Sequence, residues 1–171
     1  RKKDLNLSFK LHKSGFIHLD NLINDRNDKQ FEKERKVLIA PTWSINDKIF
    51  SEYLISLVEN LIEEKVRVIL RLHPMNKEKF INVFNTKSYF KEIVVDNSNN
   101  YRSFNEVDLL ITDWSTIACE FFYSQRKNVI FINTPPKKRN KNIQENKLIE
   151  TFEYIFRQSL GNSFNVDEIK N

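Results

Sequence analysis

The chain has 171 residues, a hydrophobic content of 40%, a charged content of 30% and a formal net charge of +5. These values are typical of one folded domain with a sizeable core, and no apolar run approaches the ~20 residues of a membrane-spanning helix. One cysteine excludes an internal disulfide, and two glycines, Gly15 and Gly161, exclude the phosphate loops GxGxxG and GxxxxGK. Because the sequence begins RKKDLNLSFK, without an initiator methionine, we expect it to be part of a longer protein.

Strand and helix patterns alternate along the chain. Short apolar runs rich in β-forming residues predict five strands, at 37–40, 67–72, 91–96, 108–112 and 128–133. Apolar residues at helical spacing predict helices between these strands, at 49–65, 76–85 and 115–125, a short helix or turn at 101–107, and one amphipathic helix at 143–160. Ser115 is the expected N-cap of the helix at 115–125.

This alternation predicts an α/β fold, a doubly wound and mostly parallel sheet with helices on both faces. Such a sheet binds ligands outside the carboxyl ends of its strands. The residues that follow each predicted strand are therefore the candidates for a site, and the first four such segments read PTWS, HP, DNS and DWST.

The segment RLHP follows the second predicted strand. His73 could donate a hydrogen bond to a phosphate oxygen, more strongly when protonated, or it could satisfy a loop carbonyl. Arg71 lies two residues earlier and shares the side-chain direction of His73 if the strand extends that far. Arg71 could steer anions or pair with a carboxylate.

The segment TDWST lies where a strand turns into a helix. The first N–H groups of a helix lack partners within it, so with the helix dipole they favour an anion, and the hydroxyls of Ser115 and Thr116 could add two donors. Asp113 would repel a phosphate and more plausibly orders the turn by accepting N–H bonds. Glu120, over one turn into the helix, is either a ligand for a sugar hydroxyl or a surface glutamate.

Other candidates at this edge are weaker. Thr42 follows the first strand, and Trp43 beside it is either a wall of the site or a core residue. The run at 96–100, DNSNN, could hold a base or ribose or form an ordinary turn. Cys119 reads as a small buried hydrophobe, and three histidines without paired cysteines give no metal signature.

The positive charge fits nucleic acid, an anionic membrane surface or a phosphorylated small molecule, although codon bias toward Lys and Asn would produce the same excess. The densest basic run, PPKKRNKN at 135–142, is either a solvated loop or a specific site. It lacks interleaved aromatic residues, so we expect no nucleic-acid partner.

Three segments in this order, VLIAPTWS, VILRLHP and DLLITDWSTIACEFF, resemble the CDP-glycerol glycerophosphotransferases of teichoic-acid and capsule synthesis. The upstream segment SGFIHLD is similar to the Gly-Tyr-Pro-Arg-x-Asp segment of that family. The resemblance covers about residues 15–133. It implies a GT-B enzyme with two Rossmann-like domains, in which residues 37–171 form the domain that binds the nucleotide donor and residues 1–36 a linker or the end of a preceding domain.

The resemblance also implies site roles. His73, as the catalytic group, and the Ser115–Thr116 turn would contact the donor diphosphate, with Thr42, Arg71, Asp113 and Glu120 as further donor-binding residues. An acceptor hydroxyl would attack the β-phosphorus of CDP-glycerol and CMP would leave, with no cofactor. The implied location is cytoplasmic, at the inner face of the cell membrane, with peripheral contact through the full-length protein and a polyol-phosphate or glycan acceptor.

The sequence departs from the family pattern at Ser44, where Arg is usual, and at Ile17 and His18, where Pro and Arg are usual. The loss of Arg at position 44 leaves another CDP-alditol or a CMP-sugar open as donor. A glycosyltransferase or epimerase that uses a UDP-sugar would want Ser-Gly-Gly at the last helix start, where this chain has Ser-Thr-Ile. A receiver-like, non-catalytic α/β domain would want an acidic pair after the first strand, where this chain has Pro41 and Thr42.

Overall fold

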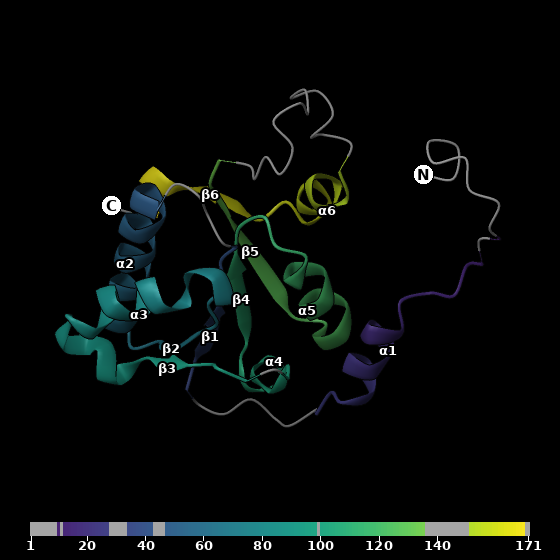
Figure 1. The fold of residues 1–171 in the computed structure, drawn as a ribbon, viewed down its shortest axis with the longest axis horizontal. Helices are drawn as coiled ribbons and strands as arrows, with labels where there is room; N and C mark the ends of the chain where they lie inside the picture. The colour runs from purple at the N-terminus through teal and green to yellow at the C-terminus, as the bar shows by residue number, and fades with distance from the viewer. Residues whose placement is uncertain are drawn as a thin grey trace.

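The computed structural model describes residues 10, 12–27, 34–42, 47–98, 100–135 and 151–169. A six-stranded sheet, in the order β3-β2-β1-β4-β5-β6, forms the centre of the fold (Figure 1). All of its strand pairs are parallel. The strands are β1 (Lys36–Ile39), β2 (Arg67–Leu70), β3 (Val94–Val95), β4 (Leu109–Thr112), β5 (Asn128–Asn133) and β6 (Ser163–Asn165).

The expected α/β fold with its parallel sheet is confirmed, and each of the five predicted strands is present. Three of them, β2, β3 and β4, are one to four residues shorter than predicted, and β1 begins and ends one residue earlier than predicted. The strand β6 was not predicted, because its residues Ser163, Phe164 and Asn165 are all exposed and form no apolar run.

Six α-helices and three 3₁₀ segments are described. The helices are α1 (Ile17–Asn24), α2 (Asp47–Glu63), α3 (Lys77–Asn85), α4 (Arg102–Glu106), α5 (Ile117–Gln125) and α6 (Phe152–Leu160), and the 3₁₀ segments are η1 (Pro74–Asn76), η2 (Ser88–Glu92) and η4 (Val166–Ile169). The predicted helix at 143–160 is wrong as one continuous element. The backbone of Thr151 is extended, and its hydroxyl accepts the N–H of Tyr154 at 3.4 Å, so a new helix begins there.

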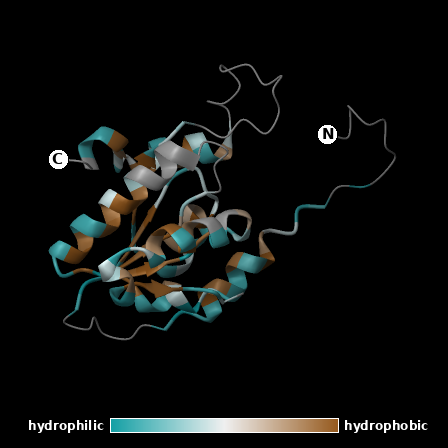
Figure 2. Ribbon diagram, turned by 60° about the vertical axis from the view of Figure 1, so that its left-hand side comes forward, coloured by the Kyte–Doolittle hydropathy of each residue, from teal (hydrophilic) through white to brown (hydrophobic). Residues whose placement is uncertain are grey.

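Residues along each strand alternate between two hydrophobic clusters, one on each face of the sheet. In β1, Val37 and Ile39 face the cluster that α2 and α3 complete, whereas Leu38 faces the other cluster. That second cluster is completed by α1, α4, α5 and α6, through Leu22, Phe104, Ala118, Phe121 and Phe156. Figure 2 shows the apolar residues of the strands and helices gathered between these layers. Burial on both faces explains why the strands read as continuous apolar runs.

The strand order reverses at β1, because β2 lies on one side of it and β4 on the other. In a sheet of this kind, the crevice outside the carboxyl ends of the two central strands is the usual place for a ligand. The helix α1, within the range expected to be a linker, packs beside α5 and buries Leu22 in the second cluster. One wall near this crevice therefore comes from residues that precede the sheet.

Candidate functional site at the carboxyl edge of the sheet

The strands β2, β1 and β4 deliver three predicted site segments to one edge. Ile39 of β1 is in register with Leu70 of β2 and with Ile111 of β4. Three residues beyond these paired positions come Thr42, His73 and Trp114. They therefore lie at about the same distance beyond the ends of their strands. Adjacent strands lie about 5 Å apart, which brings the His-Pro turn and the turn after β4 within reach of one extended ligand.

The carboxylate of Asp113 connects three strand ends. Asp113 is only 3% exposed. Its Oδ1 accepts the N–H of Thr42 at 2.7 Å, and its Oδ2 accepts the hydroxyl of Thr134 at 3.2 Å. The interpretation of Asp113 as a residue that orders the turn is confirmed by these bonds. Both carboxylate oxygens are engaged inside the protein, so Asp113 shapes the edge rather than presenting a charge to a ligand.

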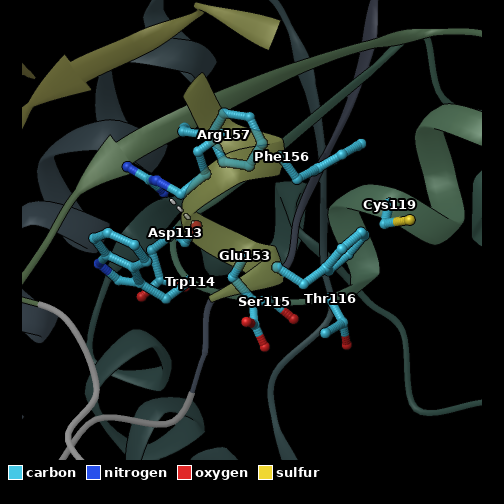
Figure 3. A pocket seen from close by; sticks show the side chains of 10 residues that line it. Asp113, Trp114, Ser115, Thr116, Cys119, Glu153, Phe156 and Arg157 are labelled. Carbon is cyan, nitrogen blue, oxygen red and sulfur yellow. Dashed lines mark hydrogen bonds between the residues drawn. The ribbon is translucent and has the colours of Figure 1, made fainter. Parts of the chain in front are cut away.

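Two further bonds complete this connection. The Nη1 group of Arg157, a residue that the sequence did not suggest, donates to the carbonyl oxygen of Asp113 (Figure 3). The indole N–H of Trp114, from the TDWST segment, donates to the carbonyl of Thr134 at 2.7 Å. Arg157 was overlooked because a lone arginine in an amphipathic helix normally reads as a solvated charge. The only sequence feature that could have indicated a buried Arg157 is its position next to Phe156 in a predicted amphipathic helix.

The start of α5 differs from the expectation. Thr116, not Ser115, is the N-cap residue; it has helical angles (φ −64°, ψ −16°) and makes no side-chain cap bond. The hydroxyl of Ser115 nevertheless accepts the N–H of Ile117 at 3.4 Å, a bond of the kind that a capping side chain makes to the second following residue. The N-cap position thus lies one residue later than predicted, because the backbone already turns helically at Thr116, while Ser115 still supplies a capping hydroxyl.

A small cavity lies between the start of α5 and α6. Ser115 and Thr116 line it together with Glu153 and Arg157 of α6 (Figure 3). Its volume is about 10 Å³, which is room for one water molecule. The start of α5 is thus accessible to a small group, and Glu153 lines the same cavity.

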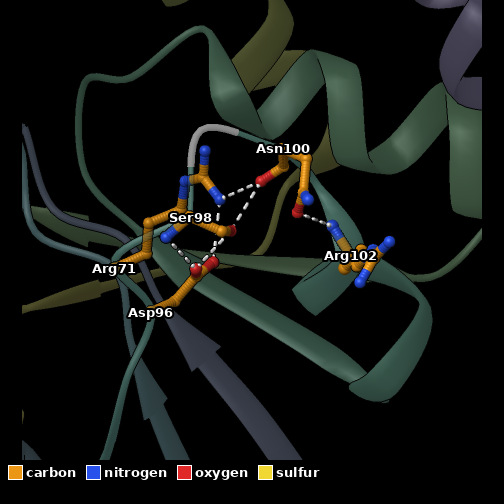
Figure 4. Close-up of polar contacts among 5 residues, drawn as sticks. All are labelled: Arg71, Asp96, Ser98, Asn100 and Arg102. Carbon is orange, nitrogen blue, oxygen red and sulfur yellow. Dashed lines mark hydrogen bonds and ion pairs between the residues drawn. The ribbon is translucent and has the colours of Figure 1, made fainter.

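On the other side of β1, Arg71 pairs with a carboxylate, the second of its two predicted roles. Its Nη1 donates to Asp96 Oδ2 at 2.8 Å and to the carbonyl of Asn100 at 2.7 Å (Figure 4). Burial alone would raise the pKa of Asp96, but hydrogen bonds from Ser98 and Arg71 outweigh it and lower the pKa. The carboxylate of Asp96 thus connects Arg71 and Ser98, and the carbonyl of Asn100 binds the same two side chains.

Glu120 is not a surface glutamate, because its side chain is 13% exposed. Its Oε1 lies 4.0 Å from Nε2 of His18 in α1, and the hydroxyl of Tyr101 bonds to its carboxylate. The guanidinium of Arg71 lies 4.7 Å above the Tyr101 ring. Burial raises the pKa of Glu120, and His18, Tyr101 and Arg71 oppose the rise in part. Glu120 therefore belongs to a polar cluster that reaches from α1 to the end of β2.

His73 is exposed and begins the 3₁₀ segment η1. Its Nδ1 accepts the N–H of Met75 at 3.2 Å. A neutral imidazole that accepts at Nδ1 carries its proton on Nε2, so Nε2 is the donor that this ring can offer to a phosphate oxygen.

The remaining predictions concern Thr42, Cys119 and the absence of a metal signature. The hydroxyl oxygen of Thr42 is buried and has no hydrogen-bond partner in the described part of the chain. Cys119, predicted as a small buried hydrophobe, is only partly buried; burial raises the pKa of its thiol, with the nearby Glu120 adding to the rise. Within the described ranges, no group of three His, Cys, Asp or Glu residues could hold a metal ion. Trp43, Ser44 and the basic run at 136–142 lie outside the described residues.

Comparison with known proteins now connects this geometry with a family. The family model of CDP-glycerol:poly(glycerophosphate) glycerophosphotransferases matches residues 3–135. The chain belongs to this family. The matched range contains β1 to β5 and every predicted site residue, from Thr42 to Glu120.

A search of the solved structures gives a match with a wall teichoic acid polymerase, TagF, at 18% sequence identity and a TM-score of 0.43. That match covers 90% of this chain and 39% of the polymerase, so this glycerophosphotransferase-family chain spans well under half the length of the polymerase. No curated protein matches at the significance required.

Replacing Asp113 by Ala should lower the free energy of unfolding by about 2–4 kcal/mol, because two buried donors lose their acceptor. Asp113→Asn should cost less, since the amide oxygen can accept from Thr42 and the NH₂ group can donate to the hydroxyl of Thr134. Urea unfolding at neutral pH measures both, with the exposed Asp167→Ala as control. Equal, small losses for the two Asp113 variants would contradict the role of this carboxylate.

Replacing Glu120 by Gln should remove the loss of folding stability that ionisation of the buried Glu120 carboxyl causes. Because burial raises the pKa of Glu120 in the folded chain, the folded state binds more protons than the unfolded state above the usual glutamate pKa, and stability falls as pH rises through that window. We expect the stability of Glu120→Gln relative to wild type to increase as the pH rises above the usual glutamate pKa. Urea titrations across this range test it, with the exposed Glu106→Gln as baseline; a flat difference would contradict the assignment.

Proposed function

We propose that this chain is the donor-binding part of an enzyme that transfers glycerol phosphate from CDP-glycerol to an acceptor hydroxyl in the synthesis of a teichoic-acid-like or capsular polymer. One observation carries the proposal. The segments that match the glycerophosphotransferase family lie together at the carboxyl edge of the sheet, beside the point where the strand order reverses. A nucleotide donor binds at such a point in doubly wound sheets.

The donor diphosphate would lie between the His-Pro turn and the start of α5. The Nε2–H of His73 offers one donor from the end of β2, and the hydroxyls of Ser115 and Thr116 offer donors from the end of β4. The first N–H groups of α5 and its dipole favour negative charge at the same place. This arrangement supports phosphate binding in a chain that contains no glycine-rich loop.

The other predicted donor-binding residues would either stabilise the loops around the site or contact the sugar of the donor. The polar groups of Asp113 and Arg71 form hydrogen bonds with neighbouring loops, so we propose that these two residues hold the site in shape and do not contact the donor. Glu120 lies beside Tyr101 and His18, where its carboxylate could accept a hydroxyl of the donor ribose. The hydroxyl of Thr42 is buried, so we assign Thr42 to the shape of the site, through its N–H bond to Asp113.

In the proposed reaction, an acceptor hydroxyl attacks the phosphorus that carries glycerol, the bond to the bridging oxygen breaks, and CMP leaves. Catalysis of phosphoryl transfer relies mainly on positioning and on stabilising charge at the phosphoryl oxygens. His73 and the start of α5 would supply that charge stabilisation. A base for the acceptor would come from a preceding domain of a GT-B enzyme, for which residues 1–36 would be the linker, so we expect this chain to bind donor without turnover.

The partners follow from the same proposal. None of the described helices is long and apolar enough to cross a membrane. We place the full-length protein at the cytoplasmic face of the cell membrane by peripheral contact, where a polyol-phosphate or glycan acceptor would be extended. No cofactor is required by the proposed chemistry.

Calorimetric titration tests the donor. We expect CDP-glycerol and CDP to bind more tightly than CMP, because CMP lacks the second phosphate that His73 and the start of α5 would contact, and UDP-N-acetylglucosamine to bind weakly. Preferential binding of the UDP-sugar would instead favour a glycosyltransferase or epimerase. Absence of binding by every cytidine nucleotide would refute the proposal.

The His73→Ala variant tests the residue assigned to the diphosphate. Loss of one charge-assisted hydrogen bond should weaken CDP binding about tenfold, with a much smaller effect on CMP. The exposed His12→Ala is the matched control and should bind both nucleotides like wild type. Equal losses for CDP and CMP in His73→Ala would remove His73 from the diphosphate site.

A further inference from the structure

The helix α6 carries a buried arginine to the carboxyl ends of β4 and β5. Arg157 is 6% exposed, although arginine is almost never fully buried unless its charge is paired. It lies outside residues 3–135, the range that matches the family, so family resemblance does not point to it. Its position follows only from the packing of α6 against the end of the sheet.

The guanidinium of Arg157 contacts two strand ends at once. Nη1 donates to the carbonyl oxygen of Asp113, and Nη2 donates to Oδ1 of Asn133 at 2.7 Å. The planar group also lies 4.2 Å from the ring centre of Trp114 and 4.7 Å from that of Phe131. Burial lowers the pKa of Arg157 and the charge of Asp113 opposes the change; arginine stays protonated in proteins.

These contacts determine how the turn after β4 is oriented. The carbonyl of Asp113 belongs to the peptide plane that also contains the N–H of Trp114, and in a trans peptide the two groups point in opposite directions. A bond to that carbonyl therefore fixes the direction in which the backbone enters the Ser115–Thr116 turn. The stacking of the guanidinium on Trp114 holds the side chain of the intervening residue as well.

From this geometry we infer that Arg157 is a positioning residue for the diphosphate-binding turn, an inference that rests on the proposed function. Arg157 holds Asp113 and Trp114 so that Ser115, Thr116 and the start of α5 keep the geometry that receives a phosphate. Its charge also offsets that of the buried Asp113 carboxylate, so the region behind the turn carries little net negative charge that would repel a phosphate.

Lysine could not replace arginine in this role. The guanidinium presents forked donors that reach acceptors on two strands while its flat face stacks on an aromatic ring, whereas an ammonium is a point charge. Arg157→Lys therefore keeps the charge and most of the volume but should loosen the turn. The exposed Arg67→Lys, at the opposite end of β2, is the matched control.

The experiment compares the affinities of CDP and CMP by calorimetry, with thermal unfolding as a check of the fold. For Arg157→Lys we expect CDP binding to weaken about tenfold, because a buried carbonyl or amide loses its donor, and CMP binding to weaken much less. Arg67→Lys should leave both affinities unchanged. For Arg157→Ala, millimolar methylguanidine should restore part of the CDP affinity, an effect that general destabilisation would not show.

If the Arg157 variants fail to fold, the Asn133→Ala variant tests the positioning role independently. It removes one acceptor of the guanidinium and keeps Arg157 itself. It should cause a smaller loss that is still selective for CDP. Wild-type CDP affinity in Arg157→Lys, or equal loss for CDP and CMP in the folded variants, would overturn the positioning role while leaving the proposed function intact. A wild-type chain that binds no cytidine nucleotide would overturn both.

Discussion

The buried carboxylate of Asp113 accepts hydrogen bonds from Thr42 and Thr134, and so holds the carboxyl ends of β1, β4 and β5 in one arrangement. Burying a carboxylate is costly unless donors and an opposite charge compensate for the lost water. Here the donors come from two neighbouring loops, and the positive charge comes from Arg157, which binds the carbonyl of the same residue. The loops after β1, β4 and β5 therefore stabilise one another, because each contributes a group to the same hydrogen-bond network.

This internal pairing decides which groups are offered to a ligand. Arg71 is matched with Asp96, and Arg157 lies beside Asp113, so these two arginines near the candidate site serve mainly to hold loops. The proposed function therefore assigns the diphosphate to His73 and to the hydroxyls of Ser115 and Thr116. The N–H groups and dipole at the start of a helix favour a phosphate at the same place.

Local pattern predicted most of the fold but not its irregular parts. Continuous apolar runs predicted β1 to β5 because parallel strands are buried on both faces. The three exposed residues of β6 carry no such signal, and the start of α6 was missed because the cap at Thr151 overrides a helical periodicity that runs through it. The N-cap position of α5 lies at Thr116, one residue later than predicted, although the hydroxyl of Ser115 accepts an N–H of the first turn as expected.

The sequence by itself determined that polar residues follow each buried strand, and alternating strands and helices place those residues at one edge of a parallel sheet. It also determined the family, through motifs that are local in the chain. Only the tertiary structure decided which polar groups pair: Asp113 with Thr42, 71 residues earlier, and Arg157 with Asp113, 44 residues later. Hydrogen bonds form only between groups in contact, and contact between such distant segments depends on how α6 and the strand ends pack, which no local pattern encodes.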